Sequence, residues 1–137
     1  MGESIFYQFI ILIPAIAFLF AVIFKGITSK VKNGKWQITK ALSSGGMPSV
    51  HSAIVTSITM AIALKYGIFS DLFAICLTFT VIIIYDAINV RFEAGLHAMA
   101  INKIVGEKFK EELGHLPSEA FAGSLVGIFT AIILYMF

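Results

Sequence analysis

The stretch IFYQFIILIPAIAFLFAVIF, residues 5–24, contains twenty residues and no charge. A helix of about 20 apolar residues crosses the hydrocarbon core of a bilayer, which is about 30 Å thick. Pro14 lies near the centre of this run, where a membrane helix tolerates a kink if neighbouring groups satisfy the freed carbonyl. Residues 5–24 are therefore predicted to form a first membrane span.

The composition extends this prediction to the whole chain. Of its 137 residues, 58% are hydrophobic and only 13% are charged, which is about half the charged fraction of a typical soluble domain. This composition argues against a water-soluble globule and leaves room for three to five spans with short connections. We expect a single membrane domain, residues 1–137.

Three more charge-poor stretches follow the first, at residues 48–66, 72–90 and 118–137. Between the last two, residues 96–113 repeat apolar side chains at helical spacing with lysines and glutamates between them, which is typical of a helix lying in the membrane interface. The predicted fold is all-α: a polytopic membrane bundle of about four transmembrane helices plus one interfacial amphipathic helix.

The positions of the charges predict an orientation. The formal net charge of +2 is too small to suggest nucleic acid as a partner. With four spans, the loop after the first span and the loop after the third lie on one side, and together they hold nine of the ten Lys and Arg residues, leaving Lys65. The positive-inside rule then places both loops in the cytoplasm and both termini outside the cell membrane.

The residues most suited to chemistry fall on this cytoplasmic side. They are the three histidines and the sole arginine: His51, His97, His115 and Arg91. The single cysteine, Cys76, lies in an apolar run, so the sequence predicts neither a disulfide framework nor a thiolate metal site.

A first motif, GGMPSVHS at residues 45–52, joins a turn to a helix start. Unpaired backbone N–H groups and the helix dipole favour an anion at such a place. Gly46 and Ser49 are therefore candidate phosphate-binding residues. The alternative is an ordinary Gly-Pro turn in which Ser49 only caps the helix.

A second motif spans residues 85–97 and carries a polar stripe. Its members are Asp86, Asn89, Glu93 and His97. On a regular helix they stay within about 60° of one direction, whereas Arg91 lies about 140° from it. Arg91 and His97 can therefore meet at one ligand only if the helix bends or restarts, with Gly95 as a candidate position. The alternative is a polar seam between helices, with Arg91 reaching lipid headgroups.

Together these motifs resemble the divergent branch of the type 2 phosphatidic acid phosphatase superfamily, which is related to vanadium-dependent haloperoxidases. The resemblance covers most of the chain, through residues 44–53, 85–98, 101–103 and 112–119. Pro48-Ser49-Val50-His51 is similar to the superfamily's Pro-Ser-Gly-His motif, with valine for glycine. Arg91 and His97 match its Arg-x5-His motif.

The resemblance implies a phosphatase in which His97 attacks phosphorus and forms a phosphohistidine. It further implies that His51 protonates the leaving group and that Arg91 and Ser49 hold the phosphate oxygens, with no metal and no cofactor. These residue types suit that chemistry, since imidazole is a nucleophile or an acid near pH 7 and guanidinium grips phosphate bidentately.

The sequence departs from the superfamily pattern at several positions. Val90 replaces the serine before the arginine, and Ile101 replaces an aspartate after the second histidine. Asn102 and Asp86 are then the candidates to orient His97. The Lys-x6-Arg-Pro motif is missing, so Lys25 and Lys40 are the candidates to supply its charge. For His115, the alternatives are a proton donor, a phosphate contact or an interface histidine.

Three functions remain open on this evidence. The leading hypothesis is a membrane phosphatase that hydrolyses a lipid phosphate or diphosphate at the cytoplasmic face. The alternatives are a non-catalytic lipid-phosphate binder of the same fold, and a metal-binding membrane protein that uses Asp86, Glu93 and His97. We expect membrane lipids as partners. Because four spans are fewer than the six common in the superfamily, a homodimer is a further expectation, and Gly123-x3-Gly127 would allow the close helix contact; the alternative is that these glycines pack within the chain.

Overall fold

A computed structural model describes residues 5–34, 45–106 and 109–137 of the chain. These residues form helices and no strand: α1 (Ile5–Gln8), α2 (Leu12–Asn33), α4 (Val50–Tyr66), α5 (Asp71–Tyr85), the π-helical turn η1 (Asp86–Val90), α6 (Arg91–Val105) and α7 (Pro117–Met136). The prediction of an all-α fold is confirmed.

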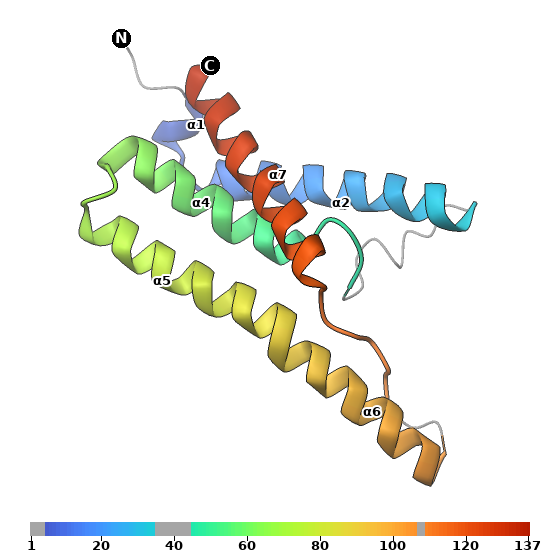
Figure 1. Cartoon of the computed structure of the whole chain (residues 1–137). Coiled ribbons are helices and arrows are strands. Elements are labelled where there is room, and N and C mark those ends of the chain that lie inside the picture. The colour runs from blue at the N-terminus through green and yellow to red at the C-terminus, as the bar shows by residue number, and fades with distance from the viewer. Residues whose placement is uncertain (1–4, 35–44, 107–108) are drawn as a thin grey trace.

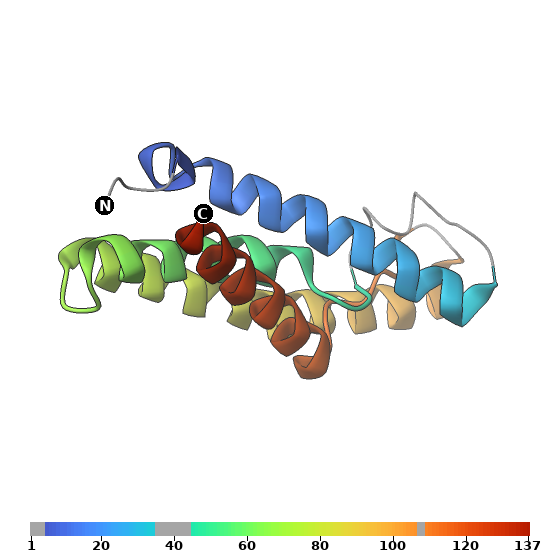
Figure 2. The ribbon, with the colours of Figure 1, turned by 90° about the horizontal axis from the view of Figure 1, so that it is seen from above.

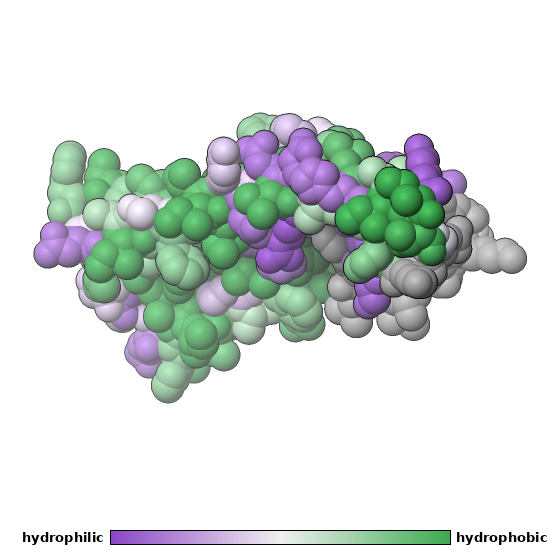
Figure 3. All heavy atoms as spheres, turned by 90° about the horizontal axis from the view of Figure 1, so that it is seen from below, coloured by the Kyte–Doolittle hydropathy of each residue, from purple (hydrophilic) through white to green (hydrophobic). Residues whose placement is uncertain are grey.

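Three helices are long and apolar enough to cross a membrane, namely Leu12–Lys32, Asp71–Val105 and Pro117–Met136. The shorter α4 is also apolar, which is in keeping with about four transmembrane helices. Large apolar side chains such as Phe79, which is 62% exposed, cover the outside of the bundle. In Figure 3, hydrophobic residues cover much of one face and hydrophilic residues gather near its middle. Such an exterior suits contact with lipid tails.

The helices are arranged around α4, which packs against α2, α5 and α7. Figure 1 shows α5, η1 and α6 as one long rod. In Figure 2, α7 crosses the other helices obliquely. The turn between α4 and α5 lies at the same end of the bundle as α1 and the C-terminus (Figure 1). The beginnings of α4 and α7 therefore face the opposite end.

Two glycines of α7 allow its close contact with α4. A Cβ at Gly123 would overlap the carbonyl oxygen of Ser49, and one at Gly127 would overlap the hydroxyl of Thr56. Thr56 donates a hydrogen bond to the carbonyl of Ser124, 3.1 Å away. The small-residue pair is thus used within the chain. These glycines therefore do not serve as evidence for the expected homodimer, which stays a prediction from the four-span length.

The first span differs in detail from its prediction. The chain turns at residues 9–11, between α1 and α2, and Pro14 lies in the first turn of α2, where the missing N–H disrupts no helical hydrogen bond. The helix α2 then continues to Asn33 and ends at Gly34, whose φ of 70° is left-handed. The basic loop predicted after the first span, which begins at Lys25, is therefore helical as far as Asn33, and Lys40 lies outside the described residues.

The predicted interfacial helix at residues 96–113 also has other bounds. Its first half belongs to the rod that starts at Asp71 and ends at Val105. We call residues 109–116, which lead back to α7, the return loop. Asn102 holds this loop, since its side-chain amide donates to the carbonyl of Phe109 at 2.8 Å and its oxygen accepts from the Phe109 N–H at 3.0 Å. The apolar spacing that predicted a helix up to residue 113 continues through residues 109–113, which are not helical.

Candidate functional site

The π turn η1 decides where Arg91 points. The N–H of Arg91 donates to the carbonyl of Asp86, five residues earlier. Because such a turn holds one extra residue, it rotates the following helix back by about 100°. Around the helix axis, the side chain of Arg91 therefore lies roughly 40° from that of Asp86, instead of the roughly 140° of a regular helix. Its Nε donates to Asp86 Oδ2 at 2.6 Å, so the pair shares one face.

The same turn receives the return loop. The N–H of His115 donates to the carbonyl of Ala87 at 2.9 Å. Gly114 lies directly against the turn, since a Cβ there would be 2.5 Å from the Ala87 oxygen and 2.6 Å from the Phe92 nitrogen. Only a glycine fits at this position without a shift of the backbone. The π turn and the loop therefore fix the backbone of His115.

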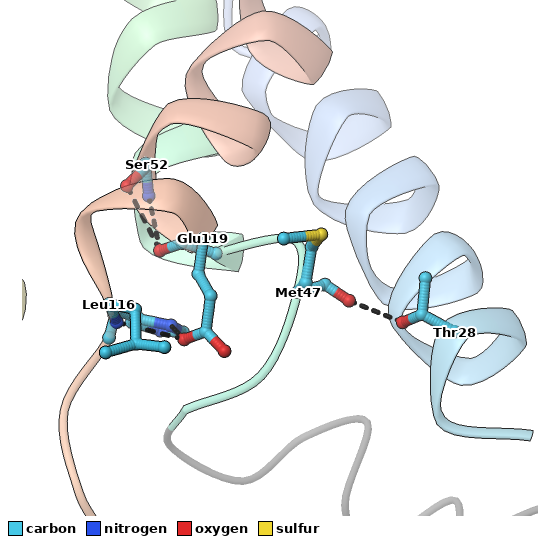
Figure 4. Close-up of polar contacts among 7 residues, drawn as sticks. Thr28, Met47, Ser52, Leu116 and Glu119 are labelled. Carbon is cyan, nitrogen blue, oxygen red and sulfur yellow. Dashed lines mark hydrogen bonds and ion pairs between the residues drawn. The ribbon is translucent and has the colours of Figure 1, made fainter. Parts of the chain in front are cut away.

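Glu119 fixes the side chain of His115 and joins two helix starts. Its Oε2 lies 3.1 Å from Nδ1 of the buried His115. The same oxygen accepts from the N–H of Leu116, also at 3.1 Å, which caps α7 (Figure 4). The backbone carbonyl of Glu119 accepts from the N–H of Ser49 at 2.9 Å. The starts of α4 and α7 are thus bound to each other beside His115.

His51 lies next to His115, with ring centroids 6.5 Å apart and ring planes at 62°. His51 is exposed, whereas His115 is only 2% exposed. Arg91 and Lys25 both act electrostatically on the two rings. We call His51, His115, Arg91, Lys25 and Glu119 the histidine cluster. Its members come from α2, α4, the rod, the loop before α7 and the first turn of α7.

Lys25 brings a buried positive charge from α2. It is 4% exposed, and a Cβ at Gly46 would lie 3.2 Å from its Cε. The glycine turn at residues 45–48 is in turn tied to α2, since the Thr28 hydroxyl donates to the carbonyl of Met47 (Figure 4). The turn therefore packs over the lysine stem without a side chain in between.

The protonation state of His115 follows from its surroundings. Burial lowers the pKa of His115 below its usual 6.5, and nearby Lys25 and Arg91 act in the same direction, while the hydrogen bond and charge of Glu119 oppose them. The imidazole is therefore uncharged at pH 7. Such a ring has one N–H donor and one free lone pair.

Comparison with known proteins identifies the family at this point. Residues 6–130 match the model of the Divergent PAP2 family. The chain belongs to the divergent PAP2 family. A curated relative, "Uncharacterized membrane protein YuiD" of Bacillus subtilis (strain 168), is 37% identical over 142 aligned residues, which cover 88% of this chain and 90% of the relative. No solved structure matches the chain at a significant level.

The predicted family resemblance is thereby confirmed, as is a multi-pass membrane protein. Of the site residues predicted for this divergent PAP2 protein, the structure brings several together. His51 and His115 lie side by side within electrostatic range of Arg91. Asp86 holds Arg91, and Gly46 lies against Lys25.

Three other predicted residues have different surroundings. His97 is exposed on α6, six residues beyond Arg91. The helix runs through Gly95 without the expected bend, so the two residues lie about 120° apart around its axis, and the extra residue in η1 also turns His97 away from Asp86. Asn102 holds the return loop at Phe109. Ser49 is fully buried, and its hydroxyl accepts from the N–H and hydroxyl of Ser52 (Figure 4), so it caps α4.

The metal alternative loses its geometric basis. Among the described residues, no three His, Cys, Asp or Glu side chains form a group that could hold a metal ion. The predicted ligands Asp86, Glu93 and His97 share a face only on a regular helix. The π turn η1 separates Asp86 from Glu93 and His97, and its extra residue rotates Asp86 away from them by about 100° around the helix axis.

Sequence reasoning assigned no role to Glu119. The signal for it was present, since Glu119 follows Leu116 by three residues across Pro117, which is the spacing of a helix cap. It also follows His115 by four residues, the spacing of a contact along one helix face. Lys25 was named only as one of two lysines that could replace a missing charge.

Proposed function

We propose that this protein hydrolyses the phosphate ester or diphosphate of a lipid at the cytoplasmic face of the membrane, with a histidine as phosphoryl acceptor. The observation that carries this proposal is a pair of imidazoles, with ring centroids 6.5 Å apart, that lie within electrostatic range of Arg91 and the buried Lys25. Two imidazoles and two cations are the groups that acid–base chemistry on a phosphate requires. Membership of the divergent PAP2 family supports the same reaction class.

The roles follow from position and chemistry. His51 is exposed, so it is suited to protonate the leaving oxygen of a substrate that arrives from the surface. Arg91 donates to Asp86 through Nε, which leaves its two terminal nitrogens for phosphate oxygens. The ammonium group of Lys25 adds a second positive charge to the same region.

The location of the proposed site follows from the charge pattern. Lys30, Lys32, Lys103 and Lys110 belong to the two basic segments predicted to lie in the cytoplasm. The lipid-facing helices carry large apolar side chains on their surfaces. A phosphate at the histidine cluster could therefore keep its acyl chains in the bilayer.

A panel of lipid phosphates and diphosphates tests the proposal. The purified protein in detergent, with chelator present, is expected to release inorganic phosphate from at least one of them. His51→Ala and Arg91→Ala should each lower kcat/KM, the latter by about 10- to 100-fold, since a hydrogen bond to a charged group contributes about 1.5–3 kcal/mol. Absence of turnover across the panel would contradict a phosphatase.

The non-catalytic alternative has one observation in its favour, the burial of His115 at 2% exposure. A phosphate that reaches only His51 and Arg91 could bind without reacting. In that case vesicles containing a lipid phosphate would bind the protein, and Arg91→Ala would weaken binding, but no phosphate would be released. The same panel therefore separates the two functions.

A further inference from the structure

We infer that His115 is the histidine that accepts the phosphoryl group, and that Glu119 is its positioning residue. This inference rests on the proposed phosphatase function and adds the identity of the nucleophile. The family resemblance implied His97 for this role.

The first argument is how firmly His115 is held. Its N–H is bound to the carbonyl of Ala87 at 2.9 Å, and its Nδ1 lies 3.1 Å from Glu119 Oε2. Gly114, directly before it, has no room for a side chain. Because its backbone and one ring nitrogen are both fixed, this imidazole has little freedom to turn. A nucleophile that must attack one particular atom needs such a fixed orientation.

The second argument is the tautomer. The Glu119 carboxylate accepts a hydrogen bond from the Nδ1–H, because an ionised carboxylate can only accept hydrogen bonds. The neutral ring then carries its lone pair on Nε2. A carboxylate that orients a histidine in this way is a recurrent arrangement in nucleophilic and general-base catalysis. Glu119 is itself held, since the Leu116 N–H donates to the same carboxylate oxygen.

The third argument is the spacing of the two rings. In-line transfer places phosphorus about 3–3.5 Å from the attacking atom, with the leaving oxygen and its proton donor on the far side. The two reactive ring nitrogens are then separated by roughly 6–7 Å. The rings of His51 and His115, with centroids 6.5 Å apart, are close enough for one phosphate to lie within reach of both after a rotation of His51. His51 is exposed, so its ring can rotate to admit a phosphate, while His115 stays fixed.

The step balances without any further reactant than water. The Nε2 lone pair of His115 forms a bond to phosphorus, and the ester P–O bond breaks. The leaving oxygen takes the proton of protonated His51. Water then attacks phosphorus and gives its proton to His51, and the N–P bond breaks and returns its electron pair to His115. The products are the dephosphorylated lipid and inorganic phosphate.

Peptide mapping of the trapped phosphoenzyme is the decisive experiment, and it needs no variant. Wild-type protein is mixed with the lipid phosphate that it turns over in the panel and is quenched in alkali. Trypsin separates the three histidines, because it cleaves after Lys40 and Lys65, after Arg91 and Lys103, and after Lys110. We expect the phosphate on residues 111–137. Phosphate on residues 92–103 or 41–65, or on no peptide, overturns the inference.

A variant of the positioning residue gives a second readout. Glu119→Gln should lower kcat by about 100-fold or more, because a wrong tautomer removes the lone pair from Nε2. Since Glu119 raises the pKa of His115, its loss should also move the acid limb of the pH–rate profile to lower pH. The matched control is Asp71→Asn, which removes the first-turn carboxylate of α5 at the opposite end.

The outcomes separate the two proposals. A wild-type protein that turns over no lipid phosphate contradicts the proposed function, and the inference fails with it. If the wild-type protein is active and Glu119→Gln has the same kcat and the same pH–rate profile, this result contradicts only the role of His115. A loss of kcat in Glu119→Gln without a shift of the acid limb indicates a structural role and also overturns the inference.

Discussion

His115 and its neighbour Gly114 join three separate segments at one point. Gly114 lets the return loop approach the π turn, and His115 then binds Ala87 through its backbone and Glu119 through its ring. The glycine and the histidine therefore depend on each other. A change at either residue should affect the position of the imidazole.

Gly114→Ala tests this dependence. The added methyl group would meet backbone atoms of Ala87 and Phe92, which cannot move as a flexible side chain can. We expect the free energy of unfolding to fall by about 1–3 kcal/mol, with loss of most phosphatase activity. Thermal unfolding in detergent measures the first effect. Ser118→Ala, at an exposed position nearby, is the control and should change neither.

The lowered pKa of His115 predicts a pH dependence of stability. The charged groups around it are Glu119, Lys25 and Arg91, with His51 beside it. The folded protein holds the ring uncharged below its usual pKa of 6.5, whereas the unfolded chain takes up a proton there. The free energy of unfolding should therefore fall as pH drops below 6.5 and level off below the folded pKa.

Unfolding temperatures at pH 7.5, 6.5 and 5.5 measure this effect. Other groups titrate in the same interval, so the comparison is with His115→Asn, which should lose part of the decrease between pH 6.5 and 5.5. An identical pH dependence in both proteins would show that the burial of His115 does not contribute to it.

At the level of elements, the sequence predicted the spans better than their junctions. Apolar runs without charge indicated the helices, because lipid penalises charge along their whole length. The π turn was not predictable, because the apolar pattern carries no mark of one extra residue. Its i→i+5 hydrogen bond occurs where the return loop docks, so it depends on contacts distant in sequence.

The same dependence on contacts distant in sequence explains why the site was predicted only in part. One-sided placement of His51, Arg91 and His115 was predicted from topology and is compatible with their meeting in the cluster. The assignment of His97 came from motif spacing and required a bend between Arg91 and His97. Both residues lie on the continuous helix α6, where a separation of six residues places them about 120° apart around the axis. Glu119 was readable as a helix cap, but its contact with His115 depends on where the loop before α7 lies.

The contact between α4 and α7 gives a prediction at the element scale. Gly127→Ala would place a methyl group against the hydroxyl of Thr56 and the carbonyl of Ala53. The helices must then separate, at an expected cost of about 1–3 kcal/mol. Because the start of α7 carries Glu119, activity should fall as well. Leu125→Ala, on the side of α7 where Leu125 is 38% exposed, should have the smaller effect on unfolding temperature.

Across the whole molecule, the two ends of the bundle differ in construction. At the end with the α4–α5 turn, Tyr7 donates to the carbonyl of Ala131 at 2.8 Å, and Lys65 donates to the carbonyl of Tyr7 at 2.6 Å. These contacts tie α1, α4 and α7 together without a cluster of imidazoles. The other end holds the histidine cluster. An asymmetry of this kind has a functional meaning only if the orientation in the membrane is fixed.

Cysteine labelling tests that orientation directly. In a protein with Cys76→Ala, Phe69→Cys lies in the α4–α5 turn, where Phe69 is 97% exposed, and Lys103→Cys lies at an exposed position of α6. The excess of lysines near the second position predicts that it faces the cytoplasm. In intact cells, a membrane-impermeant maleimide should therefore label Phe69→Cys at once and Lys103→Cys only after permeabilisation. The reverse pattern would place the histidine cluster outside the cell, where a phosphatase would act on lipids of the outer leaflet.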